Sequence, residues 1–146
     1  MSTVTRRLLA VSICLIGGGQ LPGAAEAGDP EALEAPLYAA TVTYVADRLK
    51  CTVKDSCCYS VGGQVPSAEL AKLLEGQRRL KPVPAHGACG GWTIDVGRIP
   101  PYGSNEQHVA SGVGGEGFPF FFCNHVLKLT PQGWTVDPKR DMCPVT

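Results

Sequence analysis

Apolar positions in the first third of the chain recur at the spacing of an α-helix. Four of them lie at i, i+4, i+7 and i+11 and so share one helical face: Tyr38, Val42, Val45 and Leu49. The β-branched run at 41–45 also suits a strand, but the charged residues at 47–50 favour the helix. We expect Pro36 in its first turn, where no N–H is needed, after a flexible arm at 28–36.

A second, shorter helix is predicted in the middle of the chain. Ser67 is a suitable N-cap, and the negative charge of Glu69 is favourable in the first turn. Three leucines then form one apolar face: Leu70, Leu73 and Leu74. Gly76 or the basic pair at 78–79 ends the helix, and residues 59–61 have the composition of a short strand before it.

The pattern changes to a period of two in the second half of the chain, which predicts strands with one buried face. The expected strands cover residues 92–97, 107–113, 118–129 and 134–137. The turn residues at 131–133 join the last two strands, so that Leu129 faces Trp134 and Leu127 faces Val136. This order predicts an α+β fold, with two N-terminal helices packed on a C-terminal antiparallel meander of about four strands.

The N-terminus has the layout of a secretory signal peptide. Arg6 and Arg7 precede an apolar run at 8–16, and the small-residue pattern at 25–27 predicts cleavage after Ala27. A membrane anchor is the alternative, but the run is shorter than the about 20 apolar residues of a spanning helix. The paired arginines leave the general secretory route and the twin-arginine route both open.

Export would place the protein in a bacterial periplasm or outside the cell, without a membrane anchor in the mature chain. The folded part, residues 37–146, is expected to be one small α+β domain. Removing Arg6, Arg7 and Glu26 from the 13 basic and 13 acidic residues leaves 11 and 12, without a block of one charge. This balance argues against nucleic acid or an anionic membrane as the partner, because both attract basic patches.

Six cysteines remain after the signal peptide, and an even number in a small exported domain predicts disulfides. They are Cys51, Cys57, Cys58, Cys89, Cys123 and Cys143. The adjacent Cys57 and Cys58 are not expected to bond to each other, because the small ring strains the disulfide. They point to opposite sides of an extended backbone, so we expect them to tie one segment to two parts of the fold. The sequence leaves the pairing open.

Metal and redox sites are weaker interpretations of the same cysteines. His86 with Cys89, and Cys123 with His125, have spacings that a pair of metal ligands can use. The chain has no HExxH or CxxC motif, and an oxidising compartment converts thiolates to disulfides. We therefore expect no metal and no cofactor.

The segment at 118–123 has the most unusual composition in the chain. It contains four phenylalanines: Phe118, Phe120, Phe121 and Phe122. Successive strand residues point to opposite faces, so these rings lie on both sides of the strand. One interpretation is a central strand buried on both faces. The other is that one face, with His125, forms a ligand or partner surface, which Pro119 supports because proline favours edge strands.

Residues 112–117 match the GxGxxG pattern of dinucleotide-binding loops. In those proteins the loop leads from a strand into a helix whose N-terminus binds the pyrophosphate. Here a strand-like segment follows, so we expect a flexible hairpin loop and no nucleotide site.

His125 with Asp95, Asp137 or a serine could form a hydrolytic triad, but the chain has no GxSxG nucleophile motif. The sequence therefore favours a non-enzymatic protein. The leading hypothesis is an exported, disulfide-stabilised binding protein that recognises another protein, as an inhibitor, an immunity-type protein or an accessory factor. The alternatives are a carrier of a small apolar ligand, or a small hydrolase or metal or redox protein that uses His125 and Asp95.

Overall fold

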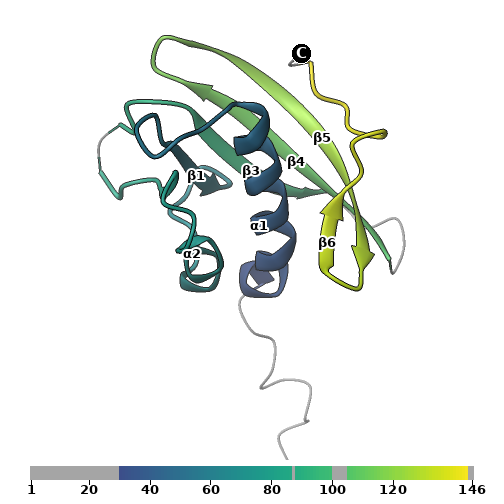
Figure 1. Ribbon diagram of the computed structural model, residues 1–146. Helices are drawn as coiled ribbons and strands as arrows, with labels where there is room; N and C mark the ends of the chain where they lie inside the picture. The colour runs from purple at the N-terminus through teal and green to yellow at the C-terminus, as the bar shows by residue number, and fades with distance from the viewer. Residues whose placement is uncertain (1–29, 87, 100–104, 145–146) are drawn as a thin grey trace, which may run out of the picture.

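The computed structural model describes residues 30–86, 88–99 and 105–144. Figure 1 shows helix α1 lying across one face of a curled sheet, with α2 beside it on the same side. We call this side of the sheet the inner face and the opposite side the outer face. The elements in chain order are α1 (Pro30–Arg48), β1 (Cys57–Val61), α2 (Ala68–Leu74), β2 (Leu80–Pro82), β3 (Thr93–Ile99), β4 (Glu106–Gly115), β5 (Phe118–Thr130) and β6 (Gly133–Val136).

The sheet has six strands in the order β2-β1-β3-β4-β5-β6. β1 is parallel to both neighbours, β2 and β3, whereas β3 to β6 form an antiparallel meander in which Leu129 pairs with Trp134 and Leu127 with Val136, as predicted. The α+β class is confirmed, but the expectation of two N-terminal helices before about four strands is wrong. α2 lies between β1 and β2, because parallel strands need a crossover connection and α2 provides it.

α1 starts earlier than its sequence suggested. It begins at Pro30, so the segment at 28–36 that we expected to be a flexible arm is helical from that residue onward, and Pro36 lies inside the helix. A proline in a helix interior costs about 3 kcal/mol. Contact with the sheet offsets part of that cost, because Arg98 on β3 donates a hydrogen bond of 2.6 Å to Glu34.

The core lies between the inner face and the two helices, and α1 packs on β3, β4, β6 and α2. The largest fully buried side chains include Tyr59, Leu70, Leu74, Ile94 and Leu127. α2 has its predicted cap, because the Leu70 N–H donates to the Ser67 hydroxyl at 3.3 Å, a contact that stabilises helices by about 1 kcal/mol. Leu73, expected on the same apolar face, is 52% exposed. Of the helices in the described ranges, neither is long and apolar enough to cross a membrane.

Three disulfides join the six cysteines, as the sequence predicted. The pairs are Cys51–Cys57, Cys58–Cys89 and Cys123–Cys143. Cys57 and Cys58 therefore connect to two different segments, which confirms the expected double anchor. The Cys58–Cys89 bond spans a sequence separation of 31, and closing a loop of that length stabilises a fold by about 3 to 4 kcal/mol in the chain-entropy account.

β4 and β5 form a long hairpin, which corrects the expected loop at 112–117. β4 continues to Gly115, so only Glu116 and Gly117 form the turn. Gly117 has a φ of 80°, a left-handed conformation that glycine adopts more readily than other residues. The first glycines of the motif are therefore strand residues.

Candidate functional site

The phenylalanines of β5 are divided between the two faces of the sheet. Phe121 lies on the inner face, half-buried against Trp92 with the ring centroids 6.0 Å apart. Phe120 and Phe122 lie on the outer face and are 64% and 70% exposed. The expectation of a strand buried on both faces is therefore wrong for these two rings. Phe118 also belongs to β5, but its side chain lies outside the described residues.

Phe120 and Phe122 form a packed pair, which we call the Phe pair. Their centroids are 4.7 Å apart and their rings are nearly perpendicular, at 86°, the edge-to-face geometry that aromatic rings favour. The rings lean from β5 over two glycines of β4. A Cβ at Gly112 would lie 3.2 Å from Phe120 Cζ, and a Cβ at Gly114 would overlap Phe120 Cδ2. The two glycines therefore allow the rings to lie against the backbone of β4.

Met142 adds a third exposed apolar side chain to the same face. Its backbone exchanges two hydrogen bonds of 3.0 Å with Asn124 of β5, and the two residues form an antiparallel bridge. Cross-strand partners share a face, and Asn124 shares the outer face with Phe122 because the two are at positions i and i+2 of one strand. Met142 is 65% exposed, so it extends the apolar surface beside the Phe pair.

His125 lies on the opposite, inner face, at the centre of a buried set of polar side chains. His125 Nε2 is 2.7 Å from Ser111 Oγ on β4, and His125 Nδ1 is 2.7 Å from Asp141 Oδ1. Neither atom of the second contact makes a hydrogen bond of standard geometry within the described residues, so we describe it as a close polar contact. The histidine and the serine have no solvent exposure.

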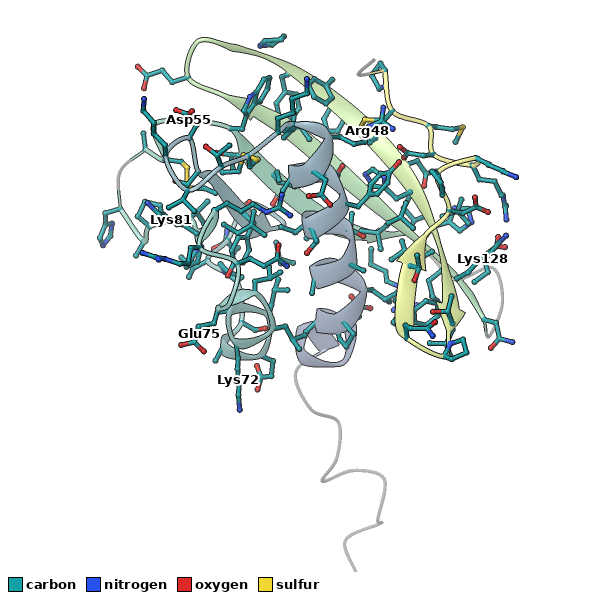
Figure 2. All side chains as sticks on the ribbon, in the orientation of Figure 1. Arg48, Asp55, Lys72, Glu75, Lys81 and Lys128 are labelled. Carbon is teal, nitrogen blue, oxygen red and sulfur yellow. A yellow bond between two sulfur atoms is a disulfide. The ribbon has the colours of Figure 1, made fainter. Side chains whose placement is uncertain are left out.

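The other carboxylate oxygen of Asp141 is bound by α1. Tyr44 donates its hydroxyl at 3.0 Å and Arg48 donates at 3.2 Å, both to Oδ2. Figure 2 shows Arg48 at the end of α1, beside the C-terminal segment that carries Asp141. We call these five side chains, Ser111, His125, Asp141, Tyr44 and Arg48, the buried network. Its centre is buried, and Arg48 closes its outer end with a side chain that is 37% exposed. It connects the first helix, the centre of the sheet and the C-terminal segment.

Burial decides the charge of His125. Desolvation lowers the pKa of its imidazole below the ordinary value, and the nearby Asp141 carboxylate opposes this effect without reversing it. Desolvation also raises the pKa of Tyr44, so its hydroxyl stays protonated and continues to donate. The network therefore contains a neutral imidazole near neutral pH.

The serine, histidine and aspartate have the order of contacts found in hydrolytic triads. A nucleophilic serine must reach a substrate, however, and Ser111 and His125 are closed off between α1 and the sheet. A groove of about 480 Å³ over α1 includes Tyr44 but neither of these two residues. The geometry therefore supports a structural role for the network.

The acids that the sequence proposed as partners of His125 lie elsewhere. Asp95 accepts hydrogen bonds of 2.6 Å from the Ser60 hydroxyl and 2.7 Å from the Gly63 N–H. Asp137 forms an ion pair of 2.8 Å with Lys128, which lowers the pKa of that carboxyl. The carboxylate beside His125 is therefore that of Asp141, and not that of either acid considered from the sequence.

The proposed metal ligands are also separated. His86 is exposed, and Cys89 and Cys123 are both held in disulfides with other residues. Within the described residues, no group of three or more His, Cys, Asp or Glu side chains is arranged to hold a metal ion.

Sequence reasoning missed Asp141, Ser111 and Tyr44, which give the buried network its form. Their contacts join positions far apart in the chain and have no local signature. A signal for the Phe pair was present, because Gly112 and Gly114 alternate along one strand opposite alternating aromatic residues of the next. Aromatic rings that cover glycines on a neighbouring strand are a recurrent feature of sheets.

Comparison with protein-family models, with curated proteins and with solved structures found no match to this chain.

Proposed function

We propose that the protein is a small, exported, disulfide-stabilised binding protein that recognises another protein through the outer face of β3, β4 and β5. The observation that carries the proposal is the Phe pair, two aromatic rings that remain 64% and 70% exposed. Clustered exposed apolar side chains often mark an interaction surface. Aromatic residues are also enriched among the residues that contribute most binding energy at protein interfaces.

The rest of the protein suits a scaffold for that surface. Three disulfides restrain the chain, and bonds of this kind are typical of proteins that fold in oxidising compartments. The Phe pair lies on the β4–β5 hairpin of a six-stranded sheet, where the pairing of Phe122 with Gly112 fixes its position. A rigid surface loses less conformational entropy on binding. The protein-binding roles that we propose for this scaffold are those of an inhibitor, an immunity-type protein or an accessory factor.

A carrier of a small apolar ligand is less well supported. Ligand sites enclose most of the ligand's surface, whereas the Phe pair lies on an open face of the sheet. The groove of about 480 Å³ over α1 is lined by other residues, among them Leu73 and Trp134.

Site-specific photocrosslinking tests the proposal. A photoreactive phenylalanine analogue replaces Phe122 in one variant and Leu129 in another. Leu129 is a matched control because it lies on the same strand and is 50% exposed. Each variant is made with its N-terminal leader and is illuminated in the compartment where it accumulates.

We expect a discrete protein adduct at position 122 and none at position 129, and we expect Phe120→Ser to weaken the adduct. Absence of an adduct at 122, or identical adducts at both positions, would count against the proposed surface.

A further inference from the structure

We infer that the partner protein adds an extended segment, as a further strand, along a part of the edge of β5 that no other strand covers. This inference rests on the proposed function and names the way in which the same region recognises its partner. Extended peptides bind many proteins in this way, because their backbone N–H and C=O groups pair with those of an uncovered edge. The uncovered part of β5 lies between the β4–β5 hairpin and the C-terminal segment (Figure 1).

The side of β5 away from β4 is only partly paired, although the strand has 13 residues. β6 pairs with residues 127–130. Asp137 donates its N–H to the Val126 carbonyl at 2.8 Å, and Met142 forms a single bridge with Asn124. Within the described residues, no strand pairs with this side of β5 at 118–122. We call the part at 120–122 the open edge.

The hydrogen bonds that β5 makes farther along show which way the backbone groups of the open edge point. Asn124 directs both its N–H and its C=O toward Met142, on the side away from β4. These directions alternate along a strand with a period of two residues, so Phe120 and Phe122 direct their groups to the same side as Asn124. Neither has a backbone partner there among the described residues. Each therefore offers one N–H and one C=O to an added strand.

The chain itself begins such an added strand and then stops. The C-terminal segment runs antiparallel beside β5, with Met142 opposite Asn124. Two residues farther on, Pro144 would lie opposite Phe122 in the same register. Proline has no N–H to donate to the Phe122 carbonyl, so Pro144 cannot continue the ladder. A partner segment on the open edge would extend a pairing that the fold already contains.

The side chains beside the open edge leave it accessible. The rings of Phe120 and Phe122 lean over Gly112 and Gly114 of β4, and so away from the open edge. Pro119 precedes the open edge, at the register shift of the β4–β5 hairpin. Its missing N–H removes no donor from the open edge but sets the end of the part that an added strand can use.

The open edge lacks the charged side chains that usually keep an edge strand from pairing with other chains. No Asp, Glu, Lys or Arg occurs in β5 from Phe118 to Leu127. The two ends of the sheet differ from it, because β2 has three residues and contains Pro82, and β6 has four residues. Short strands and proline are themselves protective. The open edge is therefore the part of the sheet best suited to accept another strand.

The geometry also defines the chemistry of the partner segment. In an antiparallel pair, the residues opposite Phe120 and Phe122 each exchange two hydrogen bonds with them, so neither can be a proline. Cross-strand neighbours share a face, so these two partner side chains lie on the outer face, beside the Phe pair and Met142. Apolar side chains there would cover rings that are 64% and 70% exposed. We expect an extended segment with apolar residues at alternating positions.

An intramolecular strand tests the inference before the partner is identified. Pro144→Val supplies the missing N–H opposite Phe122, and a short extension of alternating valine and threonine after Thr146 lengthens the strand past Phe120. We call this protein the closed-edge variant. The control keeps Pro144 and has an extension of the same length with proline at the edge-facing positions, so it cannot donate to the open edge.

Amide hydrogen exchange, followed by NMR in the oxidised protein, shows whether the edge is open. In the wild type we expect the N–H groups of Phe120 and Phe122 to exchange at least about tenfold faster than those of Phe121 and Cys123, which face β4. The closed-edge variant should slow exchange at Phe120 and Phe122 at least about tenfold, and the control should not. Slow exchange at both positions in the wild type, or no slowing in the closed-edge variant, would overturn the inference.

Photocrosslinking then shows whether the partner uses the open edge. The photoreactive analogue at position 122 is introduced into the wild type, the closed-edge variant and the control. The intramolecular strand lies beside β5 and leaves the outer face uncovered, so it removes only the edge. We expect the protein adduct of the closed-edge variant to be at least about tenfold weaker than that of the wild type, and the control to retain its adduct.

The outcomes separate this inference from the proposed function. An adduct that persists in the closed-edge variant, or that the control loses equally, would overturn strand addition and leave the outer face as the binding surface. Absence of an adduct from the wild type would remove the proposed function and this inference with it.

Discussion

Ser111 Oγ lies 2.7 Å from His125 Nε2 in an interior that solvent does not reach. The same pair on an open surface would suggest a nucleophile and its base. Here the contact satisfies two polar groups that α1 and the sheet bury together. Its consequences are therefore expected in stability rather than in catalysis.

Ser111 is expected to be unreactive in the folded protein. A fluorophosphonate probe, which labels accessible nucleophilic serines, should give no adduct under native conditions. Ser111→Ala leaves His125 Nε2 without its partner, and we expect it to lower the free energy of unfolding by about 1 to 3 kcal/mol. Labelling of the native wild type that Ser111→Ala abolishes would contradict the structural role and revive the hydrolase hypothesis.

Asp141→Asn should be one of the most destabilising single polar substitutions in the chain. The carboxylate is 1% exposed, contacts His125 at 2.7 Å, and accepts hydrogen bonds from Tyr44 and Arg48. Removing its charge is expected to cost about 2 to 4 kcal/mol in chemical denaturation. Asp55→Asn is the matched control, since Asp55 is exposed and should change stability by less than about 0.5 kcal/mol. Equal effects of the two changes would argue against the network.

Stability is expected to fall with acidification near pH 6. Burial lowers the pKa of His125 in the folded state, whereas the unfolded chain has the ordinary value of about 6.5. The unfolded state therefore binds more protons as the pH falls through about 6.5 toward the depressed value, and the free energy of unfolding decreases over that window. The groups that face His125 are Asp141, Tyr44 and Arg48.

Guanidinium titrations at several pH values between about 5 and 8 measure this dependence. His125→Gln should reduce the slope of stability against pH in that window, and His86→Gln should leave it unchanged because His86 is exposed. A slope that survives His125→Gln would assign the effect to another group.

Gly114→Ala is predicted to act through Phe120. A Cβ at position 114 overlaps the Phe120 ring, so the ring must move or the strands must separate. We expect a cost of about 1 to 3 kcal/mol in the wild type and a much smaller cost in a Phe120→Ser background. This double-mutant cycle measures their coupling, and Gly76→Ala serves as a control because no atom lies within 4 Å of its Cβ. Equal costs in both backgrounds would mean that Phe120 does not lie over Gly114.

The sequence predicted those parts of the fold that depend on local chemistry. The Ser67 cap, the pairing of Leu129 with Trp134 and the disulfide framework were all found. A cap, a hairpin and an even set of cysteines each leave a signature within a few residues or in a simple count. These features needed no knowledge of the rest of the fold.

The features that the sequence did not predict involve contacts between segments that are distant in the chain. The strand expected at 59–61 was found as β1, but it begins at Cys57; its four buried residues in succession lack the alternation that marks a half-buried strand. Pro36 suggested a helix start, but the contact of Glu34 with Arg98 holds the preceding turn against β3. Asp141 contacts His125 because the C-terminal segment runs beside β5, tied by the Cys123–Cys143 bond, and the sequence left that pairing open.

The central claim is that this chain recognises another protein through the outer face of β3, β4 and β5. Photocrosslinking from position 122, with position 129 as the control, tests it most directly in the compartment where the protein accumulates. We predict a discrete protein adduct from position 122 that Phe120→Ser weakens, and no adduct from position 129. Absence of an adduct at position 122, or identical adducts at both positions, would contradict the claim.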